Sequence, residues 1–209
     1  MKRDTRMTAG RKRAFDKSEA LDRAMRVFWE NGYSGTSVCD LTEALGINKP
    51  SLYAAFGNKE QLFARVLEHY TSHYGAPLRE RLSQPADAPI ADRIRAYMLG
   101  IIDLVNSKEL PKGCLFVKSS CEAGGSALPE DLSLTLQVMR QANEKSLAEV
   151  LEHERKLGQL PATAKPKDLA EYLVSVLYGL SVLSKQGKSR GELIRIVDIA
   201  INALPTPDG

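Results

Sequence analysis

The sequence is poor in cysteine and lacks long apolar runs, and both shortages limit what the protein can be. Its 209 residues include three cysteines at irregular spacing and no C-x-x-C pair, which excludes a disulfide framework. No apolar run reaches the roughly 18 residues that cross a bilayer, and the first residues lack the apolar segment of a signal peptide. We therefore expect a cytoplasmic protein with no membrane partner.

Enzyme signatures are also missing. The sequence contains no glycine-rich phosphate loop, no H-E-x-x-H and no G-x-S-x-G, so we predict a protein that is not an enzyme and has no cofactor. The composition is otherwise ordinary for a soluble protein, with 43% hydrophobic and 26% charged residues. A chain of this length has room for one large core, or for one small domain and one larger domain.

The charge is unevenly placed along the chain. Six of the 29 Lys and Arg residues fall within the first 13 positions, against one acid, whereas the remainder has 23 basic and 25 acidic residues. A basic segment ahead of a near-neutral body is typical of an arm that lies along DNA phosphates or enters a minor groove. We predict such a flexible arm over residues 1–14, with Arg11, Lys12 and Arg13 on DNA. The alternative is a solvated tail without a partner.

Residues 36–59 have the pattern of two short helices joined by a tight turn, followed by the start of another helix. Ser37 has the position of a helix N-cap, with Asp40 three residues later. Gly46 stands where the first helix ends, and Asn48 is placed to cap the second. The second helix has one small, polar face, which fits a helix-turn-helix that reads the DNA major groove. Two short helices around a glycine turn also occur in proteins that never bind DNA.

The whole sequence has helical periodicity and no strand-like alternation, so the predicted fold class is all-α. The pattern indicates about nine helices: an N-terminal three-helix domain with the helix-turn-helix over residues 15–60, and a larger helical bundle over residues 61–205. The fourth helix, which Asn58 caps, is expected to end at about Tyr74, before Gly75 and Pro77.

The run from Gly10 to Tyr70 resembles the DNA-binding domain of the TetR/AcrR family of bacterial transcriptional regulators. The matching stretches include Gly32-Tyr33 with Thr36-Ser37, the Ala44-Leu45-Gly46-Ile47 turn, Ser51-Leu52-Tyr53 with Phe56, and Asn58-Lys59-Glu60. The resemblance implies a regulator, most often a repressor, that binds a near-palindromic double-stranded operator as a homodimer and is released by a small-molecule effector. It also implies these DNA contacts: Thr36, Ser37, Lys49, Ser51, Tyr53, Ala54 and Lys59.

The last two helices are too apolar to be exposed on one side. We expect one face of each in the core and the other on a second subunit, with these interface residues: Leu173, Leu177, Leu180, Ile194, Val197 and Ile201. The family resemblance further implies an effector cavity in the C-terminal domain. Its candidate lining residues, which are more often simply core, are Tyr70, Tyr74, Tyr97, Met98, Phe116, Cys121, Met139 and Tyr178.

A cysteine-based sensor of oxidants or electrophiles is an alternative within the same fold. Cys114 and Cys121 are two helical turns apart, about 10 Å along the axis, which excludes a disulfide between them in an intact helix. Lys112 and Lys118 are near enough in sequence to lower the pKa of a thiol. The competing interpretation is that the cysteines are small apolar fillers.

Two further alternatives remain open from the sequence. His69 and His73 have the i, i+4 spacing of metal ligands, with His153 or Glu122 as a third ligand brought in by folding, although we predict no metal site. A function of another class is a helical small-molecule-binding protein or enzyme with a vestigial helix-turn-helix. In that case, substitution of Tyr53 and Lys59 would leave function intact.

Overall fold

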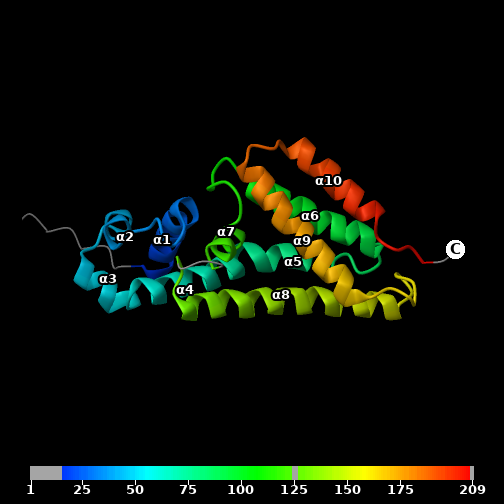
Figure 1. Ribbon diagram of the computed structural model, residues 1–209, viewed down its shortest axis with the longest axis horizontal. Coiled ribbons are helices and arrows are strands. Elements are labelled where there is room, and N and C mark those ends of the chain that lie inside the picture. The colour runs from blue at the N-terminus through cyan, green and yellow to red at the C-terminus, as the bar shows by residue number, and fades with distance from the viewer. Residues whose placement is uncertain (1–15, 124–126, 208–209) are drawn as a thin grey trace, which may run out of the picture.

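The computed structural model describes residues 16–123 and 127–207, and every regular element within them is a helix (Figure 1). In chain order the elements are α1 (Lys17–Asn31), α2 (Val38–Leu45), α3 (Lys49–Phe56), α4 (Lys59–Tyr70), the π-helical turn η1 (Thr71–Gly75), α5 (Ala76–Glu80), α6 (Ile90–Val105), α7 (Leu115–Glu122), α8 (Glu130–Lys156), α9 (Pro166–Lys185) and α10 (Arg190–Asn202). The predicted all-α fold is confirmed. No described helix is both long enough and apolar enough to span a membrane.

Capping residues at the helix ends explain why the sequence predicted several helix boundaries correctly. Asp16 accepts the N–H of Ser18 at 2.8 Å and begins α1. Gly46 ends α2 in the left-handed region, at φ +67°. Reciprocal capping boxes, in which each side chain bonds the other residue's backbone, begin α2, α4 and α10 with the pairs Ser37 and Asp40, Asn58 and Gln61, and Ser189 and Glu192.

The predicted end of the fourth helix at Tyr74 is wrong. Helical backbone continues from α4 through η1 into α5, so that the rod reaches Glu80. The turn widens at η1, where the N–H of Ala76 bonds the carbonyl of Thr71, five residues back. Pro77 follows directly in the first turn of α5, where a missing N–H is tolerated. The change in hydrogen-bond pattern thus lets a proline sit inside a continuous helix.

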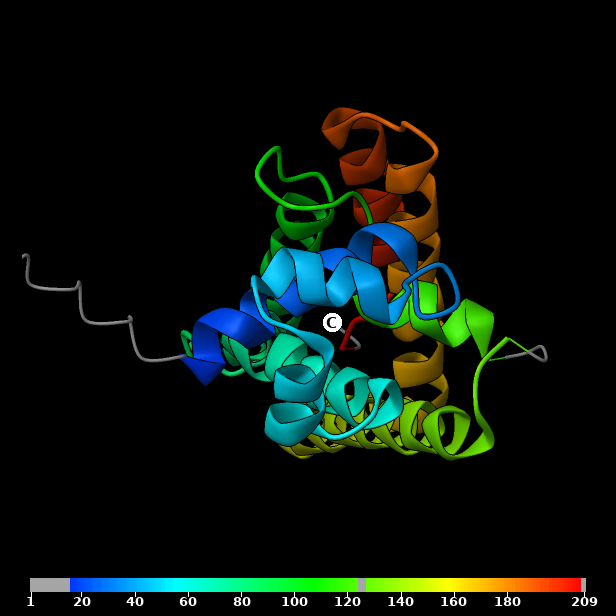
Figure 2. The same cartoon turned by 90° about the vertical axis from the view of Figure 1, so that its left-hand side faces the viewer.

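The molecule is elongated, with α1–α3 at one end of its long axis (Figure 1). The α4–α5 rod leads from that end into the body, and α8 runs beside it with α9 packed across it. Helix α10 packs on α6 and α9 at the opposite end. Viewed along the axis, α1–α3 lie in front of the bundle (Figure 2). This arrangement leaves α2 and α3 free of the larger helices on their outer side.

Two hydrophobic cores support the two ends of the molecule. The first joins α1–α4 to α7 and the first half of α8, around Phe28, Trp29 and Phe63. The second joins α6, α9 and α10 to the second half of α8, around Met98 and Ile102. Helix α8 therefore belongs to both cores, and α7 packs with the helix-turn-helix although it lies in the predicted C-terminal domain.

Candidate nucleic-acid interface

Helix α3 presents a small, polar face at the tip of the molecule. Asn48 caps it by accepting the N–H of Ser51 at 2.9 Å, while Leu52 and Phe56 are fully buried on its inner side. The buried pair fixes the rotation of α3, because residues four apart share a helix face. The residues turned outward are those predicted to meet DNA: Lys49, Ser51, Tyr53 and Ala54.

The outward face of α3 carries one long cation. Lys49 lies with its Nζ 5.6 Å from the ring centroid of Tyr53, whose side chain is 41% exposed. One lysine can make few base-specific contacts, so phosphate contacts and DNA shape must contribute much of any recognition. The other predicted cations, Arg11, Lys12 and Arg13 of the arm, lie outside the described residues.

The start of α2 offers backbone N–H groups beside an exposed hydroxyl. Ser37 Oγ accepts the N–H of Asp40 at 3.1 Å, and Asp40 accepts the Ser37 N–H at 2.7 Å. These hydrogen bonds lower the pKa of Asp40. Thr36, by contrast, is 2% exposed and donates its hydroxyl to the carbonyl of Gly32 at 2.6 Å. The predicted DNA contact by the Thr36 side chain is therefore corrected: its role is to hold the turn before α2.

Lys59 begins α4 and is held against Tyr33 from the α1–α2 link. Its Nζ lies 4.1 Å from the ring centroid, and the Tyr33 hydroxyl donates to Glu60 at 2.8 Å. Partial burial lowers the pKa of Lys59, while nearby carboxylates of Glu60 and Glu122 oppose that shift. The ring contact holds the ammonium group at the start of α4, at the edge of the candidate interface.

Two side chains of α7 reach the end of α1, and the sequence patterns did not indicate either contact. Glu122 Oε2 accepts the N–H of Tyr33 at 2.9 Å. Lys118 Nζ donates to the carbonyl of Glu30 at 2.6 Å. Lysine side chains often bond the free carbonyls at the end of a helix, as Lys118 does at the end of α1. Here the lysine and the carbonyl are 88 residues apart in the sequence. Periodicity within either helix carries no information about such a pair.

The predicted effector-lining residues do not converge on one cavity. Tyr70 packs in the first core and Tyr74 lies against Trp29, whereas Tyr97 and Met98 belong to the second core. Phe116 and Met139 are partly buried against the first core, and Cys121 is exposed. One predicted residue, Tyr178, lines a cavity of about 430 Å³ between α7, α8 and α9, together with Ser120, Ala123 and Arg140. The other residues were predicted to line a cavity because of their residue types, and residue type does not distinguish a cavity wall from a core.

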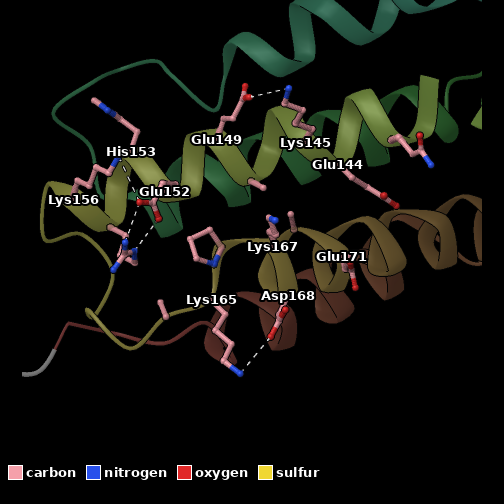
Figure 3. Close-up of a pocket in the computed structure, with 16 residues that line it drawn as sticks. Glu144, Lys145, Glu149, Glu152, His153, Lys156, Lys165, Lys167, Asp168 and Glu171 are labelled. Carbon is pink, nitrogen blue, oxygen red and sulfur yellow. Dashed lines mark hydrogen bonds and ion pairs between the residues drawn. The ribbon is translucent and has the colours of Figure 1, made fainter. Parts of the chain in front are cut away.

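A larger groove of about 1220 Å³ lies between the second half of α8 and the start of α9 (Figure 3). None of the predicted effector residues lines it. Its walls carry five Asp or Glu side chains and five Lys or Arg side chains, and several are paired, as Arg155 is with Glu152 at 2.9 Å and Lys165 with Asp168 at 3.9 Å. The groove is at the end of the molecule opposite α3 (Figure 1).

Cys114 and the two histidines have contacts of their own. Cys114 precedes α7, and its Sγ accepts the Tyr70 hydroxyl at 3.1 Å. Burial raises the pKa of the Cys114 thiol, opposite to the effect expected from the neighbouring lysines. His69 Nε2 lies 2.6 Å from Asp22 Oδ1, and its ring stacks with His73. Among residues 16–123 and 127–207, no group of three potential ligands is placed to hold a metal ion.

Four of the six residues predicted for the dimer interface belong to the core of the chain itself. Leu173, Leu180 and Val197 are at most 1% exposed within one protomer, so they cannot form an outer face. Leu177 is also buried, whereas Ile194 and Ile201 are partly buried. The exposed apolar side chains of α9 and α10 are instead Tyr172, Val182 and Ile199.

The sequence of this chain matches known protein families. Residues 20–66 match the model of bacterial regulatory proteins of the tetR family, and residues 91–199 match the tetracyclin repressor-like C-terminal domain. The chain is 32% identical to the HTH-type transcriptional repressor ComR of Escherichia coli strain K12, over 94% of this chain and 92% of ComR.

Solved structures agree with the sequence comparisons. A cysteine mutant of the TetR family transcriptional regulator CifR, complexed with 26-bp operator DNA, is 36% identical and has a TM-score of 0.84, covering 93% of this chain and all of that one. A second CifR cysteine mutant with operator DNA is 37% identical with a TM-score of 0.82, covering 94% and 100%. The relatives named here are transcriptional regulators rather than enzymes. This chain therefore belongs to the TetR family of bacterial transcriptional regulators.

Proposed function

We propose that the protein is a repressor that binds a near-palindromic operator as a homodimer and leaves it when a small molecule binds the C-terminal helices. The observation that carries the proposal is the outward face of α3, set at the tip of the molecule beside the capped start of α2. The similarity to CifR in complex with operator DNA supports it. The cavity between α7, α8 and α9 is the candidate effector site.

A mobility-shift titration tests the DNA-binding part of the proposal. The probe is DNA from the region upstream of the protein's own gene, with random-sequence DNA of equal length as the control. We expect selective binding whose logarithmic affinity falls linearly with the logarithm of salt concentration, because phosphate contacts release counterions. Equal affinity for both DNAs would favour the alternative of a vestigial helix-turn-helix.

We propose that the dimer forms through the exposed apolar side chains of α9 and α10. Ile199 is 69% exposed in the protomer, and Tyr172 and Val182 lie on α9, which packs beside α10. Replacing Ile199 with Asp should raise the dimer dissociation constant at least about 100-fold, because the interface would bury an unpaired carboxylate. Sedimentation equilibrium measures the change. Leu157→Asp, at a site 63% exposed beyond α8, is the matched control and should dimerise normally.

Oxidant sensing by cysteine is the second candidate, and we propose Cys121 as the sensing residue. Cys121 is exposed on α7, whereas Cys114 has a raised pKa through burial. At pH 8, iodoacetamide should modify Cys121 at least about 30 times faster than Cys114, because the thiolate is the reactive form. Mass spectrometry of peptides sampled over time gives both rates. Comparable rates would contradict the assigned burial.

Serine variants of the two cysteines separate this candidate from ligand release. If oxidation is the signal, peroxide-induced loss of operator binding should disappear in Cys121→Ser and persist in Cys114→Ser. Unchanged release in the double variant Cys114→Ser, Cys121→Ser would end the redox interpretation.

A further inference from the structure

Helix α7 lies between the DNA-binding end and the larger bundle and has contacts on both sides. It packs on α1 and α4, and it also packs on α8 and α9. Ser120 and Ala123 line the cavity that Tyr178 closes from α9. Lys118 and Glu122, on the same short helix, reach the end of α1 instead. One eight-residue helix thus joins the candidate effector cavity directly to the α1–α2 turn.

The α7 side chains satisfy backbone groups that α1 cannot satisfy itself. The last carbonyls of any helix have no partner within the helix. Lys118 Nζ donates to the carbonyl of Glu30 at 2.6 Å, and that of Trp29 lies 3.4 Å away. Just beyond the helix, Glu122 accepts the N–H of Tyr33 at 2.9 Å. The position of the turn therefore depends on α7.

The fit at this contact is close. Gly32 has φ +79°, and a Cβ added to it would lie 1.9 Å from Glu122 Oε1. A side chain at position 32 would therefore expel the carboxylate from the turn. The absence of a side chain is what allows Glu122 to reach the backbone of Tyr33.

The α1–α2 turn also positions groups at the candidate DNA interface, at the starts of α2 and α4. The Tyr33 ring lies under Lys59 Nζ, and the Tyr33 hydroxyl holds Glu60, so the start of α4 is tied to the turn. Thr36 donates to the Gly32 carbonyl at 2.6 Å, which ties the cap residue Ser37 to the same turn. A displacement of Tyr33 would thus move groups at the starts of both α2 and α4.

We propose that Glu122 and Lys118 are positioning residues for operator binding. By holding the α1–α2 turn, they keep Ser37 and Lys59 in the arrangement that binds DNA. A ligand seated against Ser120 and Ala123 acts by shifting α7 and loosening this hold. The inference rests on the proposed repressor function, and it assigns the signal a route through α7 to the α1–α2 turn, from which it reaches the starts of α2 and α4.

Variants at Glu122 test, without any effector, whether its contact with the α1–α2 turn supports operator binding. Glu122→Ala removes the acceptor for the Tyr33 N–H, whereas Glu122→Gln makes the same charge change but keeps an oxygen that can accept it. We expect Glu122→Ala to bind the operator about tenfold more weakly, with Glu122→Gln within about threefold of the wild type. Binding to random-sequence DNA should be the same in all three proteins, because it depends on phosphate charge rather than on exact placement.

The other outcomes are informative as well. Equal operator affinity of Glu122→Ala and Glu122→Gln would overturn the proposal. A parallel loss on both DNAs, together with a lower melting temperature, would show a merely structural role and also overturn it. Lys118→Met should reproduce the selective loss, and Glu80→Ala, at an exposed position of α5, should have no effect. If the wild type itself shows no operator preference, the proposed function fails before the variants are compared.

Discussion

Replacing Glu154 with methionine is expected to lower the free energy of unfolding by about 3–5 kcal/mol, because it leaves a buried guanidinium without its counter-charge. The side chains of Arg93 on α6 and Glu154 on α8 are 4% and 6% exposed, with Arg93 Nη2 2.6 Å from Glu154 Oε2. Nη2 lies close to the carboxylate without an aligned hydrogen bond, so its contact is chiefly ionic. Urea denaturation at fixed protein concentration measures the loss.

The Arg93–Glu154 pair holds the connection between α5 and α6 in place. Arg93 also donates to the carbonyls of Leu82 and Ala88, at 3.0 Å each. A double variant, Arg93→Met with Glu154→Met, should therefore lose less than the sum of the single variants but should not regain wild-type stability, because two carbonyls lose their donor.

An exposed ion pair provides the control for Glu154. Glu149 on α8 lies 3.9 Å from Lys145, and both side chains are more than 60% exposed. Glu149→Met should cost less than about 1 kcal/mol, since exposed pairs contribute little. A similar loss for Glu149→Met and Glu154→Met would contradict the importance given to burial.

Local capping chemistry explains why the starts of the helix-turn-helix could be predicted. Ser37, Asn48 and Asn58 each bond a backbone N–H three residues ahead, so the information is contained in four consecutive residues. The outward face of α3 follows in the same way, because Leu52 and Phe56 fix which side is buried. These features required no knowledge of the rest of the chain.

Tertiary packing decided the features that were predicted wrongly. Thr36 has the residue type of a phosphate contact, but the turn closes over it. Leu180 and Val197 are apolar residues in apolar helices, and periodicity cannot tell which face meets its own core and which meets a partner. Glu122 escaped notice for the opposite reason: its partner is 89 residues away, and no local pattern marks it. The helix through Pro77 depends on a π turn, for which the sequence gives no simple signal.

Replacing Ala54 with aspartate is expected to reduce operator affinity by at least about 100-fold, or roughly 3 kcal/mol. Ala54 is exposed on α3, beside Ser51 and Tyr53 on the outward face. A carboxylate there would meet the acceptor-rich edges of the bases and the negative phosphates, and Lys49 would be the one long cation on the helix to offset it. Mobility shift at moderate salt measures the loss. Folding should be unaffected, because the side chain points away from the core.

A matched substitution distinguishes local repulsion from a change in net charge. Ala142 is exposed on α8, so Ala142→Asp adds the same charge far from α3. It should change operator affinity by less than about threefold, since charges beyond a Debye length of about 8 Å are screened at physiological salt. If both variants weakened binding equally, overall charge would account for the loss and α3 would not be the reading helix. A large loss confined to Ala54→Asp would leave α3 as the element that enters the groove, because the two proteins carry the same net charge.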